Sequence, residues 1–283
     1  MKKILVPVDF SANSNKSIRF ALQLAVQSHA EVIFYHVVSI MAPTVDAAWD
    51  FTYYAQFQQD TLELRQKQLT RLVKTIYNAI QPQGVRYSCI CELNNAVSDT
   101  IIKYAKKQKI DFICAGARGT GFMAKLFGTV ATHLITHSPV PVFVIPKNYR
   151  LKPISDLCYA SDMENPDIEI KKVLELSRTL HASAKILHFD YAIDLQENHQ
   201  KLSAIAKKYQ TKTISFHYKK LNALYPLHDH LKRAVASIKP SLLVLFTRQD
   251  RNWFDRMLLS SESAELSFAS KVPLLVFRKN RKQ

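Results

Sequence analysis

Short apolar runs alternate with amphipathic stretches along this chain, and the whole order occurs twice. The run Ile4–Val8 is typical of a strand buried on both faces, and Asn13–Ser28 carries apolar residues at helical spacing. Strands that alternate with helices predict a parallel sheet with helices on both faces. The sequence therefore predicts the doubly wound α/β class, and its 283 residues suit two domains better than one.

The expected elements follow the same order in both parts of the chain. Strands are expected at Ile4–Val8, Val32–Val38, Val85–Cys91, Phe112–Ala115 and Val142–Ile145, then at Leu157–Ala160, Lys185–Phe189, Thr213–His217, Leu242–Phe246 and Leu274–Phe277. Helices are expected at Asn13–Ser28, in a long stretch ending near Ile80, and at Val97–Lys107, Phe127–Thr136, Ile168–Leu180, Leu195–Tyr209, Leu227–Ser237 and Ser261–Ala269.

The two parts also match in sequence. The matches are Asp9 with Asp162, Val32–His36 with Ala184–His188, and Ser138–Ile145 with Ser270–Phe277, the last without a gap. They indicate an internal duplication, with one domain at residues 1–148 and a second at 151–283. Each domain is expected to be a mostly parallel five-stranded sheet flanked by helices.

Four of the five glycines lie in one short window after the strand expected at Phe112–Ala115: Gly116, Gly119, Gly121 and Gly128. Glycine lets backbone N–H groups approach an anion closely, and a helix N-terminus attracts negative charge. A loop that only needs positive φ angles would require one or two glycines. The window therefore predicts a phosphate or nucleotide site, in which a Cβ at Gly116 or Gly128 would fill the phosphate space.

The second part contains no glycine. Extending the ungapped match backwards sets Gly116 against Arg248, Gly119 against Arg251, Gly121 against Trp253, Gly128 against Ser260 and Thr129 against Ser261. On this register the second domain is degenerate, and we expect the nucleotide in the first domain alone.

Further candidate site residues lie at strand ends of the first part. Asp9 follows the first strand, where its carboxylate can accept hydrogen bonds from a ribose or an adenine amino group, or cap the next helix. Val37 offers backbone groups to a purine edge, or is a core valine; Pro7, on the strand before Asp9, is counted with them. Thr129 opens the last helix toward the phosphates, and Arg118 adds positive charge or is solvated.

At these residues the chain resembles a tandem universal stress protein along essentially its whole length. The opening Lys2–Ser11 resembles that family's first strand, and the glycine window resembles its G-x2-G-x9-G-[ST] motif, with eight residues instead of nine between Gly119 and Gly128. In ATP-binding members the aspartate and the residue after the strand-two histidine hold the adenosine, and the motif residues hold the phosphates. The matching positions are Asp9, Val37 after His36, Gly116, Gly119, Gly128 and Thr129.

The resemblance implies a fold like flavodoxin and the adenine-nucleotide α-hydrolases, and an adenine-nucleotide-binding protein of stress response or signalling. The implied ligand is ATP, with ADP and AMP as alternatives and with or without Mg²⁺. The implied pairing joins the last strands of two domains, within one chain or in a homodimer. A structural interaction protein without nucleotide and a slow ATPase remain alternatives, because the shortened loop either draws the phosphate site inward or weakens it.

Other sequence features favour simpler interpretations. The chain lacks P-loop, HExxH and GxSxG motifs, and His133 with His137 is a metal pair or a surface pair. The net charge of +16 raises the question of nucleic acid, but the lysines are dispersed outside short clusters such as Lys219-Lys220, which favours solvated faces.

The remaining features concern compartment and partners. The apolar start ends too early for a signal peptide, no run approaches a membrane helix, and the four cysteines suit reduced thiols. We therefore expect a cytoplasmic protein that is not an enzyme. The segment Ser39–Phe57, with Trp49, Tyr53 and Tyr54, is a lid, a partner surface, or packs on its own domain.

Overall fold

The computed structural model of the chain describes residues 1–40, 51–117, 129–191, 203–209, 211, 213–222, 224–225, 227–247 and 272–279. Several predicted positions lie outside these residues: Trp49, Arg118, Gly119, Gly121, Gly128, Arg248, Arg251, Trp253, Ser260, Ser261, the helix expected at Ser261–Ala269 and part of that at Leu195–Tyr209. Of Thr129 the structure gives the place in the backbone alone.

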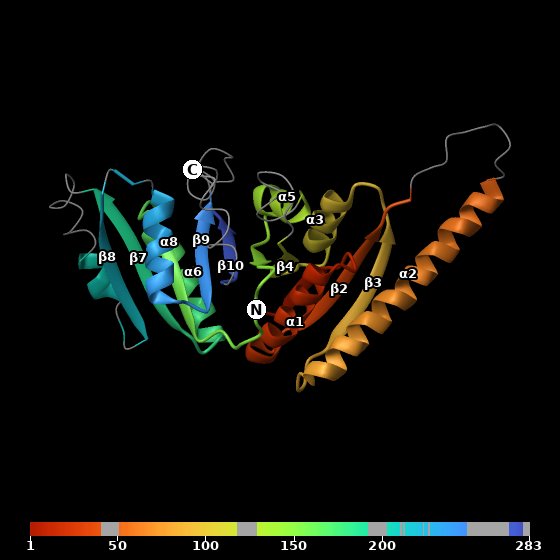
Figure 1. Ribbon diagram of the computed structural model, residues 1–283, viewed down its shortest axis with the longest axis horizontal. Helices are drawn as coiled ribbons and strands as arrows, with labels where there is room; N and C mark the ends of the chain where they lie inside the picture. Colours follow the sequence, from red (N-terminus) through yellow and green to blue (C-terminus); the bar gives the residue numbers. More distant parts are fainter. Residues whose placement is uncertain are drawn as a thin grey trace.

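Ten strands form one continuous sheet in the order β3-β2-β1-β4-β5-β10-β9-β6-β7-β8 (Figure 1). The strands are β1 (Lys3–Pro7), β2 (Glu31–Val38), β3 (Tyr87–Leu93), β4 (Phe112–Gly116), β5 (Val142–Ile145), β6 (Asp156–Ser161), β7 (Ser183–Tyr191), β8 (Ile214–Leu221), β9 (Leu242–Thr247) and β10 (Leu274–Arg278). The helices are α1 (Ala12–Ser28), α2 (Phe51–Ile80), α3 (Val97–Lys107), α5 (Thr129–His137), α6 (Pro166–Thr179) and α8 (Leu227–Ile238), with a further helical stretch at 203–209.

Each half has its strands in the order third, second, first, fourth, fifth, and all pairs within a half are parallel. This is the order of a nucleotide-binding doubly wound sheet, so the predicted fold class is confirmed. The reversal of strand order falls between β1 and β4 in the first half and between β6 and β9 in the second. Ligands bind such folds at the carboxyl ends of the strands at that point.

The halves join through their last strands. β5 and β10 pair antiparallel, with Phe143 opposite Leu275 and its neighbours Val142 and Val144 opposite Val276 and Leu274. Phe143 and Leu275 are counterparts in the duplication, so a pseudo-twofold axis passes between them. The pairing through last strands that the resemblance implies is therefore internal to this chain.

Two apolar cores lie on the two faces of the sheet. Alternate residues of β1 divide between them, since Ile4 and Val6 face α1, α2 and α6, while Leu5 faces α3, α5 and α8. Burial on both faces explains why the strands read as unbroken apolar runs, and each fully buried branched side chain contributes about 1.5–3 kcal/mol. In Figure 1 α2 lies along the outer end of the sheet beside β3, and β8 forms the opposite end.

The backbone repeats its unusual conformations in both halves. Left-handed φ angles recur in three pairs: Phe10 and Met163 (61° and 58°), His29 and His181 (54° and 51°), and Lys109 and Lys239 (52° and 50°). Non-glycine residues rarely adopt this region, so its recurrence at matching places supports the duplication. The exact domain limits, 1–148 and 151–283, remain a prediction.

Strand pairing corrects the ungapped register between the glycine window and the second half. Ile4 lies opposite Phe112 and its counterpart Leu157 lies opposite Leu242. Counting along these strands sets Gly116 against Phe246, not Arg248. The second half has two more residues between its last two strands, because Gly116 pairs with Ile145 whereas Phe246 pairs with Phe277.

The helices of the described residues show neither a membrane-spanning segment nor, at the start of α2, buried aromatic side chains at Tyr53 and Phe57. No α-helix in the described part of the chain is both apolar and long enough to pass through a bilayer. On α2, Tyr53 is 64% exposed and Phe57 is 47% exposed, so these aromatic side chains do not pack into the core of their own domain.

Candidate functional site

A cavity of about 200 Å³ lies at the carboxyl ends of β1, β2 and β4, where the strand order reverses. Four predicted residues line it together: Pro7, Asp9, Val37 and Gly116. They come from three strands that are distant in sequence, so their convergence results from the sheet topology. It occurs at the edge where doubly wound folds bind ligands.

Asp9 shapes the turn between β1 and α1. Its Oδ1 accepts a hydrogen bond from the Ser11 N–H at 2.9 Å, and the intervening Phe10 has a left-handed φ of 61°. Ser11 is the N-cap of α1, since its hydroxyl accepts from the Ser14 N–H at 3.2 Å. Ser11, and not Asp9, therefore caps the helix, and the exposed Asp9 holds the turn at the rim of the cavity. The predicted role of Asp9 toward a ligand stays a prediction.

His36 ties the end of β2 to the end of β1. Its Nδ1–H donates to the Val8 carbonyl at 2.7 Å, and its ring meets Phe10 edge-on with centroids 4.7 Å apart. Burial lowers the pKa of His36, which favours the neutral ring. His188 Nδ1 lies 2.8 Å from the Ser161 carbonyl in the second half, so this histidine is a structural position shared by both repeats.

Tyr35 is a lining residue that sequence reasoning missed. It is buried beneath the cavity, its hydroxyl donates to the Glu92 carboxylate, and its ring stacks on Tyr104 with centroids 4.3 Å apart. Burial raises the pKa of Tyr35, so the hydroxyl stays protonated as the donor. Strand alternation was the available signal, because Tyr35 and Val37 lie two residues apart and share one face.

Gly116 has a packing reason that does not involve a ligand. A Cβ there would lie 2.9 Å from the Asn13 carbonyl oxygen and 3.1 Å from Ser17 Oγ, both on the first turns of α1. Glycine thus allows β4 and α1 to approach closely. A Cβ at Gly116 would therefore meet α1, whereas the sequence predicted that it would fill the space for phosphate. Gly116 nevertheless lines the cavity.

The amino end of α5 also contributes to the lining of the cavity. The helix begins at Thr129, and Val130 and Ala131 line the cavity together with Val97 and Ile101 of α3. The first N–H groups of a helix have no partner within the helix and attract anions. The cavity therefore combines an apolar wall suited to a planar ring, a carboxylate at its rim, and a helix terminus suited to a phosphate.

The corresponding place in the second half is engaged by internal ion pairs. Lys279, which is buried, donates to the Asp162 carboxylate and, at 3.2 Å, to Glu164. Glu169 is also buried, lies 3.7 Å from the Lys279 ammonium, and accepts from the Tyr159 hydroxyl. Asp162 is the counterpart of Asp9, so the aspartate of the second half already has an ammonium partner.

The side chain of Phe246, the counterpart of Gly116, adds bulk nearby. Its ring stacks on Phe277 with centroids 4.8 Å apart and meets Tyr159 edge-on at 5.2 Å. The first half thus has a glycine, Gly116, at the position where the second half has the buried ring of Phe246.

The histidine pair and the cysteines were the other candidates for chemistry. His133 Nε2 lies 3.0 Å from Asp99 of α3 and the His133 and His137 rings stack at 4.2 Å, so a carboxylate that is distant in sequence joins this pair. Among the described residues, no group of three or more His, Cys, Asp or Glu side chains is placed to hold a metal ion. The four cysteines are free thiols, and burial raises the pKa of Cys89 and of Cys91 to about 11.

Comparison with known proteins identifies a family for this chain. A sequence model described as "Universal stress protein family" matches residues 1–146. A universal stress protein of Methanocaldococcus jannaschii is 28% identical over 151 residues, which cover 52% of this chain and 82% of that protein. One from Bacillus subtilis is 26% identical over 147 residues, covering 50% of this chain and 97% of that protein.

A solved structure matches the whole chain. The crystal structure of a universal stress protein from Archaeoglobus fulgidus superposes with a TM-score of 0.71 and 17% identity, covering 98% of both chains. At this identity the match concerns the fold, and it includes both halves.

Proposed function

This chain belongs to the universal stress protein family, and we propose that its first half binds an adenine nucleotide while its second half binds none. The observation that carries the proposal is the convergence of Pro7, Asp9, Val37 and Gly116 on one cavity beside the amino end of α5. We propose ATP as the ligand, with ADP and AMP as competitors for the same place. The protein then acts as a binding module in stress response or signalling, without rapid catalytic turnover.

The described part of the cavity suits the nucleoside portion. Its walls are apolar at Val37, Ile101 and Val130, which favours a planar base, and Asp9 at the rim can accept from a ribose hydroxyl. The phosphates would extend toward the amino end of α5. Arg118, Gly119, Gly128 and Thr129 are proposed to contact them.

The asymmetry between the halves supports a single site. An incoming ribose would have to displace the Lys279 ammonium from Asp162, which would leave a buried charge without its partner. In the first half the equivalent lysine, Lys147, is exposed. The crevice of the second half is therefore neutralised internally by Lys279, and the first half has an exposed lysine at the corresponding position.

The test separates the turn-forming role of Asp9 from its role toward a ligand. Asp9→Asn keeps an oxygen that accepts from the Ser11 N–H but removes the charge, whereas Asp9→Ala removes both. In thermal denaturation, ATP at 100 times its dissociation constant should stabilise the wild type by about 2.7 kcal/mol. We expect Asp9→Asn to keep wild-type stability without ATP and to bind ATP about tenfold more weakly, since hydrogen bonds to charged groups are the stronger ones.

The outcomes distinguish the candidate functions. A wild type without any shift at millimolar ATP contradicts nucleotide binding and leaves a structural interaction protein. Equal ATP affinity in the wild type and Asp9→Ala contradicts the assigned role of Asp9. Phosphate release above background that disappears in Asp9→Ala would instead favour a slow ATPase.

A further inference from the structure

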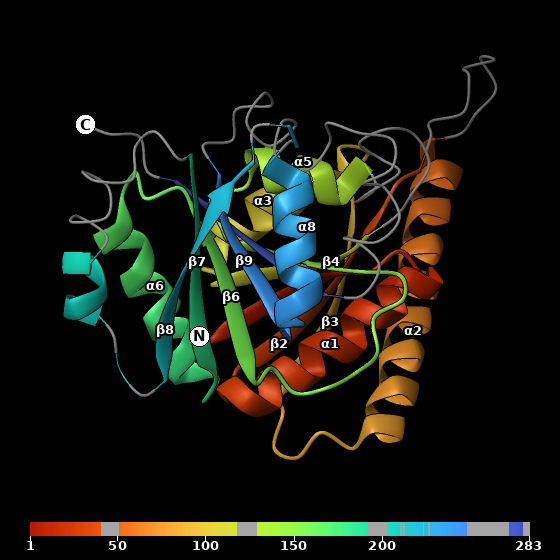
Figure 2. The same cartoon turned by 60° about the vertical axis from the view of Figure 1, so that its left-hand side comes forward.

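The pseudo-twofold axis between β5 and β10 relates two grooves on the face of the sheet that carries α1 and α6. The linker, residues 146–155, runs from the end of β5 past α1 to β6 (Figure 2), and the strip beside α1 that it covers is called the first groove. Tyr149 of the linker is buried edge-on against Phe20 of α1, with ring centroids 5.5 Å apart. Gln27 of α1 accepts from the Ile154 N–H at 2.9 Å and donates to the Ile154 carbonyl at 3.0 Å.

Equivalent polar contacts close the end of each groove, where the chain enters β6 in the first groove and β1 in the second. The atoms are Ser241 Oγ with the N–H groups of Ser155 and Asp156 (3.0 and 2.9 Å), and Asp111 Oδ2 with those of Lys2 and Lys3 (2.6 and 2.9 Å). The equivalence sets Met1 in the second groove at the place of Ile154 in the first. At this end of the two grooves, Asp111, Lys2 and Lys3 therefore take the places of Ser241, Ser155 and Asp156.

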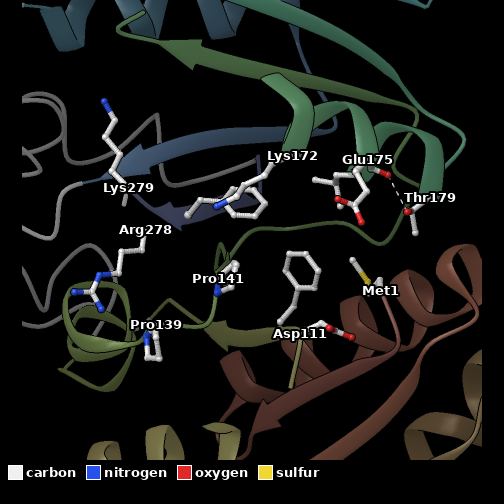
Figure 3. A pocket seen from close by; sticks show the side chains of 12 residues that line it. Met1, Asp111, Pro139, Pro141, Lys172, Glu175, Thr179, Arg278 and Lys279 are labelled. Atoms are coloured by element: carbon white, nitrogen blue, oxygen red, sulfur yellow. Dashed lines mark hydrogen bonds between the residues drawn. The ribbon is translucent and has the colours of Figure 1, made fainter. Parts of the chain in front are cut away.

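Where the linker lies in the first groove, the second groove holds a cavity of about 610 Å³ (Figure 3). Its floor includes Phe112 and Phe277, whose ring centroids lie 6.1 Å apart, together with Pro141. Lys172 and Glu175 reach it from α6 on one side, opposite Met1 and Asp111. Lys279 also borders the cavity, but its ammonium points away toward Asp162.

The second groove differs from the first in charge. Aligning α1 and α6 at His29 and His181 sets Lys172 at the place of Phe20, the residue that holds Tyr149 in the first groove. The Lys172 ammonium lies 5.9 Å from the Phe277 ring centroid, and the exposed Arg278 stands at the rim. An occupant that follows the path of the linker would therefore meet an aromatic floor, with the cations Lys172 and Arg278 at one end and the carboxylates of Glu175 and Asp111 at the other (Figure 3).

We propose that this cavity binds an extended peptide segment of a partner protein, along the path that the linker takes in the first groove. An aromatic side chain of the peptide covers the Phe112 and Phe277 rings, and an adjacent acidic side chain pairs with Lys172. The residues that follow β10 in the sequence are unsuited to this place. Arg281 and Lys282 correspond to Tyr149 and Arg150 of the linker, and they would add positive charge beside Lys172.

The test uses the full chain and a defined probe. The probe is a fluorescent ten-residue peptide with the linker sequence of residues 146–155, carrying Lys147→Glu, Arg150→Glu and Lys152→Glu. Fluorescence anisotropy should show binding of this acidic peptide. Two control peptides should bind at least about tenfold more weakly, which corresponds to about 1.4 kcal/mol. They are the unaltered basic linker peptide and the acidic peptide that also carries Tyr149→Ala.

Charge reversal in the protein gives the sharper readout. Lys172→Glu should weaken binding of the acidic peptide about tenfold and strengthen binding of the basic one. Lys171→Glu is the matched control, because Lys171 is the exposed neighbour on α6 and does not line the cavity, and it should leave both affinities unchanged.

Two results would overturn the proposal. One is no binding of the acidic peptide up to about 1 mM, the weak limit for a specific contact. The other is equal binding by Lys172→Glu and Lys171→Glu, which would place the peptide elsewhere. Asp9→Ala tests independence from the nucleotide site, since peptide binding should survive in that variant even where ATP binding fails.

Discussion

Gly116→Ala should destabilise the fold even when no nucleotide is present. The added Cβ would lie 2.9 Å from the Asn13 carbonyl oxygen, 3.0 Å from the Asn13 carbonyl carbon and 3.1 Å from Ser17 Oγ. The two nearest atoms belong to the backbone of α1 and cannot rotate away as the Ser17 side chain can, so the helix must move by a few tenths of an ångström. Overpacking of this kind costs about 1–3 kcal/mol. Alanine restricts the unfolded chain and returns about 0.4–1 kcal/mol, so the midpoints of the two ranges leave a net loss of about 1.3 kcal/mol.

Urea denaturation followed by circular dichroism, with and without ATP, measures this loss. Gly84→Asn is the matched control, because a Cβ at Gly84 meets nothing within 4 Å and asparagine tolerates its φ of +71°. We expect that variant to stay within about 0.5 kcal/mol of the wild type. A Gly116→Ala protein that matches the wild type without ATP but has lost ATP binding would refute the packing argument and assign the glycine to the ligand.

Two other perturbations test the polar contacts of the strand ends. Because burial lowers the pKa of His36 below its usual 6.5, the unfolded state binds the proton more readily, so this contribution to stability is present above pH 6.5 and is lost as the pH falls below it. His36→Asn can still donate to the Val8 carbonyl but does not titrate, so its urea midpoint should fall less than that of the wild type on acidification; an identical fall would contradict the assignment. Lys279→Met leaves the carboxylates of Asp162 and Glu169 without their ammonium and should cost about 3–5 kcal/mol at neutral pH in the same assay, with partial recovery when Glu169→Gln is added. A Lys279→Met protein as stable as the wild type would show that the buried ion pairs are not needed for folding.

Periodicity was sufficient to predict most of the fold. The limits of α3 and β5 agree with the predicted Val97–Lys107 and Val142–Ile145, because their apolar patterns end at polar or proline residues. The join of the last strands, β5 and β10, was expected from the family resemblance, since no local pattern indicates which strand edges meet; its antiparallel direction was not predicted. Four of the predicted site residues, Pro7, Asp9, Val37 and Gly116, line one cavity, and their role in binding a ligand stays a prediction.

Contacts between distant residues were beyond reach of the sequence. Nothing in the spacing of Lys279 indicates that its ammonium crosses to Asp162, because the pairing depends on where β10 ends relative to β6. The reason for Gly116 was also hidden, since close approach to Asn13 is a property of the packed helix. The ungapped register that set Gly116 against Arg248 failed because two inserted residues shift the frame between β9 and β10.

The β5–β10 junction also decides what would happen if the halves were separated. A lone first half would expose the edge of Val142–Ile145, and an exposed apolar edge readily recruits another strand. The β5–β10 pairing is already pseudo-symmetric, with Phe143 opposite its counterpart Leu275. A second copy of the first half could therefore pair with this edge in the same way, and the product would be a homodimer with two identical candidate sites. In the fused chain each first half always pairs with one second half. The second half could therefore lose its binding residues while the ten-stranded sheet remained intact.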